Sequence, residues 1–164
     1  MTEQNAAELA EVMEKYRSAV YGTALANTRC RSDADDVYQE VFLLYYTKDL
    51  SFESEAQRRA WLIRTCINRC RTLSRSAWYS KRSDEDVELF PDGSAATPAE
   101  REVWQAVRSL NEKYRTVVYL FYFENMSAAE IADALGVSEG AVNMRLTRAR
   151  KQLKASLKED GYFG

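Results

Sequence analysis

Hydrophobic residues recur at helical spacing along most of the chain. In the N-terminal part they include Leu9, Val12, Tyr16 and Val20, and this spacing predicts a first helix over residues 6–28. No segment shows a convincing strand-like alternation of apolar and polar residues. The pattern therefore favours an all-α protein.

The stretch "RSDADDVYQEVFLLYY" predicts a second helix, with Ser32 as its cap and Asp35 near its positive end. Its apolar stripe consists of Val37, Val41 and Leu44. After the polar segment "TKDLSFESE", a third helix is predicted from residue 56 to about residue 76. These helices are expected to form one helical bundle.

A polar stretch, "SKRSDEDVELFPDGSAATPAE", interrupts the helical pattern and reads as a flexible, acidic linker. Thr97 then provides a cap, Pro98 suits the first helical position, and Glu100 completes a capping box. Two helices are predicted over residues 98–110 and 112–125. The run "TVVYLFYF" in the second of them is β-prone by composition, but its polar flanks favour a buried helix.

The segment "MSAAEIADALGVSEGAVNMRLTRARKQL" predicts a helix-turn-helix. Ser127 and Glu130 form a capping box, Gly136 turns the chain, and Ser138 caps the second helix. One narrow face of that second helix is apolar and carries Val142, Leu146, Ala149 and Leu153. The opposite face and its flanks are polar or basic and carry Gly140, Asn143, Met144, Arg145, Thr147, Arg148 and Lys151. These side chains suit base edges and phosphates in a DNA major groove. The alternative is a helical hairpin whose basic face is merely solvated.

Composition and charge narrow the function. The 164 residues are 46% hydrophobic and 29% charged, which is typical of a globular protein. The chain holds no histidine, so the commonest general base and metal ligand are missing, and we expect neither an enzyme nor a metal or cofactor site. No run approaches the roughly 18 apolar residues of a membrane span, and the acidic N-terminus is unlike a signal peptide. We therefore expect a cytoplasmic protein that does not insert into a membrane.

The net charge of −2 conceals two basic blocks. Residues 56–83 and 145–154 contain no acidic residue, whereas acidic residues gather near residues 3–14, 33–40 and 84–102. Two such blocks suggest two contacts with a polyanion, although each could also be a solvated helix face.

The first basic block also contains Trp61, Trp78 and Tyr79, and aromatic rings beside arginines are suited to unpaired bases. Trp61 stands among apolar positions, which favours a place in the core instead. Cys66 and Cys70 are one helical turn apart and are most simply small core residues.

From about Tyr16 to Leu153, with a gap in the linker, the chain resembles group IV (extracytoplasmic-function, ECF) sigma factors of the sigma-70 family. Three stretches in this order carry the resemblance: "DADDVYQEVF", "AWLIRTCINRCR" and the segment from "LNEKYR" to "ARKQL". It implies a sigma-2-like domain over residues 1–78, a linker over 79–97 and a sigma-4-like domain over 98–164.

The resemblance also implies partners and site residues. The partners would be promoter DNA, core RNA polymerase through its β′ clamp helices and β flap, and in some cases an anti-sigma factor. The surface for the polymerase would consist of Asp35, Asp36, Gln39 and Glu40. The −10 element would be bound and opened by Phe52, Arg58, Arg59, Arg64, Asn68, Arg69, Arg71 and Arg75. The −35 element would be read by Ser138, Asn143, Met144, Arg145, Thr147, Arg148 and Lys151.

The chain departs from the family pattern at Thr72, where many relatives carry Asp, and at Asn143 and Met144. These positions leave the architecture intact but leave the promoter sequence open. A helix-turn-helix regulator that does not recruit polymerase stays an alternative, although it would give no task to the acidic second helix or to the first basic block. A nuclease is a weaker alternative, since no cluster of carboxylates is evident.

Overall fold

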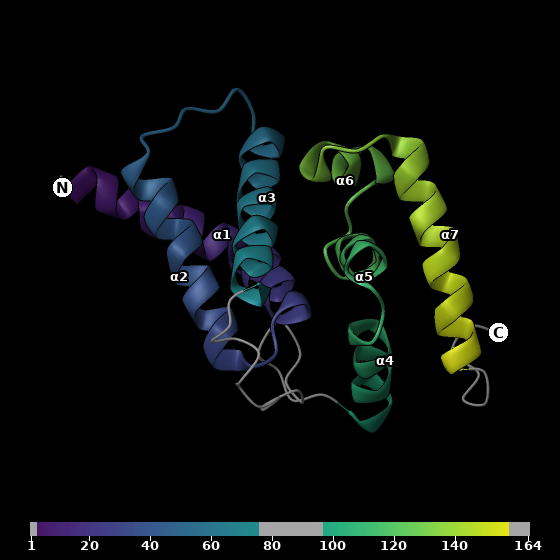
Figure 1. Ribbon diagram of the computed structural model, residues 1–164. Helices are drawn as coiled ribbons and strands as arrows, with labels where there is room; N and C mark the ends of the chain where they lie inside the picture. Colours follow the sequence, from purple (N-terminus) through teal and green to yellow (C-terminus); the bar gives the residue numbers. More distant parts are fainter. Residues whose placement is uncertain (1–2, 76–96, 158–164) are drawn as a thin grey trace.

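The computed structural model describes residues 3–75 and 97–157, and all regular elements in these two ranges are helical. The N-terminal bundle consists of α1 (Glu3–Asn27), α2 (Arg31–Thr47) and α3 (Glu55–Ser74). The C-terminal bundle consists of α4 (Pro98–Arg108), α5 (Glu112–Val118), the π-helix η2 (Tyr119–Phe123), α6 (Ala128–Leu135) and α7 (Glu139–Ser156). Figure 1 shows the two bundles side by side. The prediction of an all-α protein with two small helical domains is confirmed. The predicted linker, apart from Thr97, and the predicted aromatic pair Trp78 and Tyr79 lie outside the described residues.

The N-terminal bundle buries most of the apolar positions that the sequence pattern marked, whereas Leu9 and Leu44 are half-buried. Val20 of α1, Val41 of α2 and Leu62 of α3 have no exposed surface. The helix α3 begins at a capped end, because the Ser54 hydroxyl accepts a hydrogen bond from the Gln57 backbone N–H. Cys66 and Cys70 are buried within this bundle, as predicted.

The start of α2 differs from the prediction that Ser32 caps it. The helix begins at Arg31, after Cys30, and its N-cap residue makes no side-chain cap hydrogen bond. Asp33 instead lies in the first turn and is fully buried. Its carboxylate is therefore the acidic group at the positive end of the helix, and Asp35 lies beyond the first turn.

The C-terminal bundle depends on local capping. Both predicted capping boxes are present, Thr97 with Glu100 at α4 and Ser127 with Glu130 at α6. The predicted helix over residues 112–125 is α-helical only to Val118 and continues as η2 through the aromatic run. A π-helical turn widens the backbone and changes the direction of the side chains that follow.

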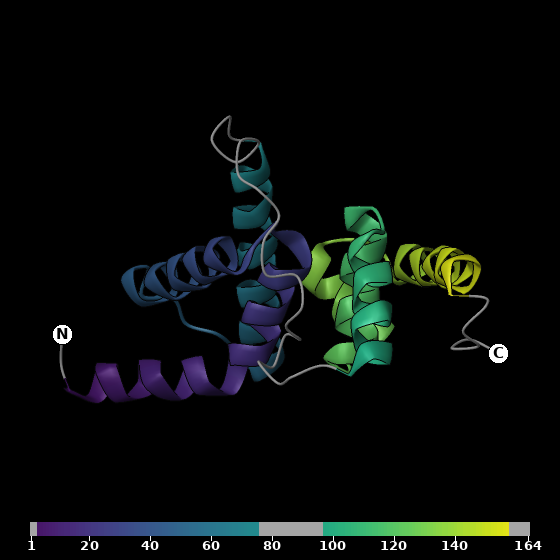
Figure 2. The same ribbon diagram turned by 90° about the horizontal axis from the view of Figure 1, so that it is seen from below.

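The two bundles contact each other along α3 and α6, and along α1, α5 and η2. Their buried side chains form one continuous hydrophobic cluster. In Figure 2, α7 lies on the side of the C-terminal bundle that faces away from the N-terminal bundle. This packing places α6 against the N-terminal bundle and leaves the outer face of α7 open.

Candidate functional site

The helix-turn-helix has the predicted geometry. Gly136 ends α6 with a φ of 70°, a left-handed conformation that favours glycine. The Ser138 hydroxyl then accepts a hydrogen bond from the backbone N–H of Ala141 and caps α7. The apolar face of α7 is buried, since Val142, Leu146, Ala149 and Leu153 are at most 2% exposed.

The opposite face of α7 exposes most of the side chains that the sequence analysis predicted to read bases. Its exposed members are Asn143, Met144, Thr147, Arg148 and Lys151, and Met144 is 54% exposed. The Thr147 hydroxyl donates to the Asn143 carbonyl oxygen over 3.0 Å, which leaves its methyl group and an acceptor lone pair for other contacts. Within the described part of the chain, Arg148 and Lys151 form no hydrogen bond or ion pair.

Arg150, which lies beside this face on α7, makes contacts with other side chains of the same protein. Its Nε donates to the Tyr122 hydroxyl over 2.6 Å, and its guanidinium lies over the rings of Phe121 and Tyr122. Arg145 is half-buried. The cations of α7 are therefore divided between an exposed face and an internal contact.

Aromatic rings surround the loop between α2 and α3. Phe52 stacks on Tyr45 at 6.2 Å between ring centroids, and Trp61 lies 6.2 Å from each of these rings. The Arg58 guanidinium lies over the Phe52 ring and also pairs with Glu55. Trp61 is half-buried and packs against the core, so it is partly a core residue, as the sequence favoured, and partly a surface ring.

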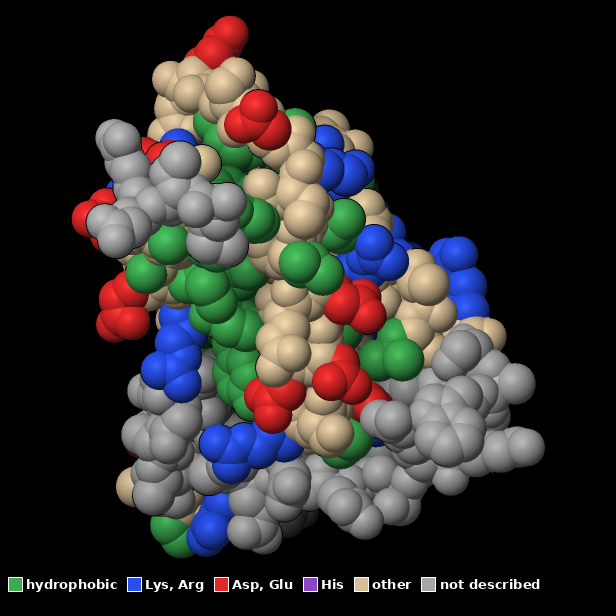
Figure 3. Space-filling view, turned by 90° about the vertical axis from the view of Figure 1, so that its left-hand side faces the viewer, with side chains coloured by type: hydrophobic (Ala, Val, Ile, Leu, Met, Phe, Trp, Pro, Cys, Tyr) green, Lys and Arg blue, Asp and Glu red, His purple; other side chains and the backbone are tan. Residues whose placement is uncertain are grey.

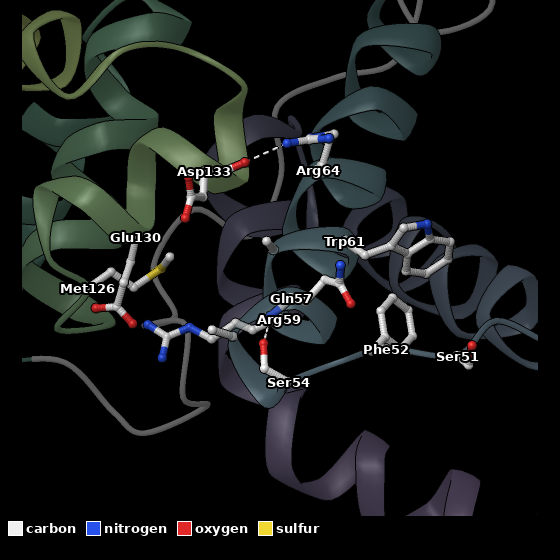
Figure 4. Close-up of a pocket in the computed structure, with 12 residues that line it drawn as sticks. Ser51, Phe52, Ser54, Gln57, Arg59, Trp61, Arg64, Met126, Glu130 and Asp133 are labelled. Carbon is white, nitrogen blue, oxygen red and sulfur yellow. Dashed lines mark hydrogen bonds between the residues drawn. The ribbon is translucent and has the colours of Figure 1, made fainter.

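A cleft of about 590 Å³ opens between this loop and α6. Phe52, Gln57 and Trp61 line it from the N-terminal bundle, together with Arg59 and Arg64 of α3 (Figure 4). Its other wall carries Met126, Glu130 and Asp133. Asn68 does not line this cleft. It lies in a separate hollow of about 260 Å³ that shares Trp61 and contains Arg69 and Thr72.

Most of the predicted −10 arginines have partners within the protein. Arg64 donates to the backbone carbonyl oxygens of Asp133 and Ala134, and Arg59 donates to that of Glu124. Arg69 lies 3.7 Å from the Glu40 carboxylate, and Arg71 pairs with Glu112 at 2.6 Å. Arg75 caps the C-terminal end of α3 through its backbone.

The predicted polymerase surface lies on α2. Asp36, Gln39 and Glu40 are exposed, and Leu43 beside them is 62% exposed. Figure 3 shows this side of the molecule, where acidic side chains lie next to a strip of hydrophobic surface. Asp35 is half-buried, and the pKa of Tyr21 is raised by burial and by a hydrogen bond to Asp35.

No sequence pattern indicated the side chains that join the two bundles. Ser18 of α1 donates to the Glu124 carboxylate at 2.8 Å, and the Tyr119 hydroxyl lies 2.9 Å from the same carboxylate oxygen and 3.1 Å from the Ser18 carbonyl oxygen. Arg115 donates to the Asn27 side-chain oxygen. These contacts link residues up to 106 positions apart, so no local pattern could have indicated them.

Within the described ranges, no group of three or more His, Cys, Asp or Glu residues could hold a metal ion. The pKa of the Cys66 thiol is raised by its hydrogen bond with Cys70 and by burial, so this thiol stays protonated in the core. Among the helices of the described residues, none is long and apolar enough to cross a membrane.

Comparisons with known proteins follow the same division of the chain. A family model for sigma-70 region 2 matches residues 12–79, and one for sigma-70 region 4 matches residues 100–153. The chain is 34% identical over 140 residues to the RNA polymerase sigma factor NccH of Alcaligenes xylosoxydans xylosoxydans, a match that covers 77% of this chain and 74% of NccH. It is 25% identical over 166 residues to the ECF sigma factor SigW of Bacillus subtilis, covering 92% of this chain and 89% of SigW.

Solved structures give a similar result. CnrH in complex with the cytosolic domain of CnrY matches with a TM-score of 0.69 and 25% identity, covering 93% of this chain and 89% of that chain. The sigma factor RpoE of Bartonella quintana, in complex with the anti-sigma factor NepR, shares the fold with a TM-score of 0.71 and 22% identity, covering 93% and 98% of the two chains.

Proposed function

The chain belongs to the sigma-70 family as an ECF RNA polymerase sigma factor for transcription initiation, and from this premise we propose how it divides the work. The C-terminal bundle reads the −35 element as duplex DNA. The N-terminal bundle binds core RNA polymerase and opens the −10 element. The protein itself performs no catalysis, since the polymerase makes the RNA.

The outer face of α7 carries the proposal. The capping box of α6, the turn at Gly136 and the cap at Ser138 position this helix. Its apolar face is buried, and Asn143, Thr147 and Arg148 are exposed. Asn suits adenine, Arg suits guanine, and the threonine methyl group suits thymine. Exposed Lys151 supplies a phosphate contact that fixes the register of the helix.

For the −10 element, we propose that unpaired bases of the non-template strand bind in two places. These are the cleft lined by Phe52 and Trp61, and the hollow that contains Asn68. The rings of Phe52 and Trp61 provide stacking surfaces, and the arginines of α3 provide phosphate contacts. Removing a base from the stack costs a few kcal/mol, so such a pocket must compensate for that cost.

For the polymerase, we propose that Asp36, Gln39, Glu40 and Leu43 form the contact with the β′ clamp helices. The exposed acidic side chains suit a partner surface of complementary charge, and Leu43 beside them adds apolar contact area. The β flap would be contacted by the C-terminal bundle. The complexes of CnrH with CnrY and of RpoE with NepR support an anti-sigma protein as a further partner. A protein with these partners works where the polymerase does, in the cytoplasm.

Run-off transcription tests the proposal. Purified protein added to core polymerase and genomic fragments should yield discrete transcripts whose start sites share −10 and −35 elements. Binding of the protein to DNA without co-elution with core polymerase and without run-off products would instead identify a regulator that does not recruit polymerase.

A further inference from the structure

The Phe52 ring belongs to an exposed loop, but three neighbouring side chains contact it. Residues 48–54 connect α2 to α3, and all of them except Phe52 are exposed. The Phe52 ring lies 6.2 Å from the rings of Tyr45 and Trp61, and Figure 4 shows it beside Trp61. The Arg58 guanidinium lies over the same ring, 5.6 Å from its centroid. These contacts define where the ring stands at the cleft.

Arg58 contacts the ring without facing the proposed DNA sites. Of the described residues, Arg58 and Glu55 line neither the cleft nor the hollow that contains Asn68. The Arg58 Nη1 group donates to Oε1 of Glu55, and its Nε atom is buried. The charge of this guanidinium is therefore already paired, and its contact with the cleft runs through Phe52.

Glu55 connects Arg58 to helix α1. Its second carboxylate oxygen, Oε2, accepts from the Tyr16 hydroxyl and from Lys15 Nζ, the latter at 3.2 Å. Tyr16 is 5% exposed, so it is a fixed point of the core. The pKa of Glu55 is lowered, mainly by the hydrogen bond from Tyr16, and the pKa of Tyr16 is raised to about 12 by burial and by the same bond. At neutral pH the carboxylate is therefore charged and the Tyr16 hydroxyl keeps its proton.

We propose that Glu55 is a positioning residue for the −10 strand, which holds Arg58 against Phe52 and so fixes the ring at the cleft before DNA binds. A ring on a free loop would lose conformational freedom when a base stacks on it, and that loss would weaken binding. Arg58, which the family resemblance predicted to bind the −10 element, then acts through the ring and not on phosphate. This inference rests on the proposed function.

A role confined to the stability of α3 gives a different expectation. Glu55 lies in the first turn of α3, where its charge suits the positive end of the helix. Its pairs with Lys15 and Arg58 involve a carboxylate side chain that is 52% exposed, and such pairs contribute little to stability. A purely structural Glu55 would change the melting temperature and leave the binding of DNA by the folded protein unchanged.

The test uses the full-length chain assembled with core RNA polymerase, with core polymerase alone as the blank. Glu55→Gln keeps the size of the side chain and removes the charge that pairs with Arg58. Glu53→Gln makes the same charge change at an exposed loop position and is the matched control. The probe is a labelled single-stranded DNA of mixed sequence, about 20 nucleotides long, which exceeds the roughly 4–16 nucleotides that a single-strand groove commonly covers. Fluorescence anisotropy measures its binding.

Glu55→Gln should weaken single-strand binding by about threefold or more relative to Glu53→Gln, because the ring is no longer held in place. Phe52→Ala should weaken binding at least as much, and Glu55→Gln should then add no further loss, since both changes act through one ring. Additive losses, or a lower melting temperature of Glu55→Gln without a loss of affinity, would overturn the proposal.

The dependence of binding on salt separates the two roles of Arg58. If Arg58 contacts phosphate, Arg58→Gln should reduce the slope of log affinity against log salt by about 0.7, the value for one contact with a single strand. If Arg58 positions Phe52, the slope should stay unchanged while the affinity falls as it does in Glu55→Gln. A reduced slope would overturn the positioning role and return Arg58 to the DNA backbone.

Fluorine NMR gives a readout that involves no DNA. para-Fluorophenylalanine replaces phenylalanine throughout the chain, and the Phe52 signal is assigned by its absence from Phe52→Leu. This signal should be narrow in the wild type and in Glu53→Gln, and broadened or shifted in Glu55→Gln. An unchanged signal, or wild-type binding that Glu55→Gln leaves unaltered, rejects only the positioning role. A changed signal without any wild-type binding beyond that of core polymerase rejects the proposed function instead.

Discussion

The arginines of α3 and those of α7 differ in what they contact. On α3, Arg59, Arg64 and Arg71 all donate to groups of the C-terminal bundle. On α7, Arg148 and Lys151 have no polar partner among the described residues and face outward. The arginines of both helices lie in stretches of the sequence without acidic residues, so composition alone does not separate them.

Under the proposed function, this difference implies two modes of DNA binding. The face of α7 is already exposed and its helix is held by a buried stripe, so little reorganisation should precede contact with duplex DNA. Under the same proposal, the arginines of α3 would first exchange their internal partners, such as the carbonyl oxygens that Arg59 and Arg64 contact, for phosphate. We therefore expect −35 contacts to respond mainly to changes in α7 itself, and −10 contacts to respond also to changes in α6 and α1.

The largest effect should come from removing the support beneath the exposed face of α7. Leu146 is 1% exposed, and Leu146→Ala should lower the free energy of unfolding by about 2–5 kcal/mol because it leaves a cavity under the helix. Thermal or urea unfolding measures the loss. Thr147→Ala, at the next and exposed position, is the control and should change stability by less than about 0.5 kcal/mol. Equal stability of the two variants would mean that the buried stripe does not hold α7.

A smaller effect should separate the two classes of cation within α7. Arg148→Ala should cost about 1–3 kcal/mol of binding at one base-pair position of a −35 duplex, because the lost donor reads one base edge. Arg150→Ala removes an internal contact with Tyr122 and should weaken binding to all sequences alike. The measurement is a −35 element substituted one base pair at a time. A uniform loss for Arg148→Ala would assign it to the DNA backbone and leave base reading to Asn143, Met144 and Thr147.

The acidic surface of α2 differs from the basic faces of α3 and α7, because its proposed partner is a protein, the core polymerase. Asp36→Lys combined with Glu40→Lys should weaken binding to core polymerase by about fivefold or more, since an interface matched to acidic groups repels cations. Both side chains are exposed, so helical circular dichroism should be preserved. Glu11→Lys with Glu14→Lys, exposed on α1, makes the same charge change and should leave affinity unchanged. Unaltered affinity of the α2 variant would remove this surface from the polymerase contact.

The contrast between α3 and α7 also separates the features that the sequence could predict from those that it could not. The caps at Thr97, Ser127 and Ser138 and the turn at Gly136 depend on residues a few positions apart, and all were predicted correctly. The apolar stripe of α7 followed from the helical period. Local reasoning failed at Ser32, because α2 begins at Arg31 and places Ser32 inside the helix, next to the fully buried Asp33.

What the sequence could not indicate was the use of each polar side chain. Arg64 and Arg148 both stand in basic stretches of the sequence and cannot be told apart there. In the structure, Arg64 contacts Asp133 and Ala134 of α6, which are 69 and 70 residues further along the chain, whereas Arg148 faces outward. The π-helical turn at Tyr119–Phe123 was likewise not predicted, and it precedes Glu124, which joins α1. Such contacts arise from packing between bundles, for which periodicity carries no signal.

The smallest effect should distinguish among the arginines of α3 themselves. Arg69 and Glu40 are 3.7 Å apart, with side chains 40% and 56% exposed, so a double-mutant cycle to Ala should give a coupling below about 0.5 kcal/mol. Arg71 and Glu112 lie 2.6 Å apart across the two bundles, and the same cycle should give a larger coupling, up to about 1 kcal/mol. Both cycles are measured by urea unfolding at low and high salt, and the couplings should shrink as salt rises. A weak Arg69 pair would leave this arginine free to exchange Glu40 for phosphate at little cost, while Arg71 stays paired with Glu112 across the two bundles. A stronger coupling for Arg69 than for Arg71 would contradict this order, and the contacts between the bundles would then not be what distinguishes α3 from α7.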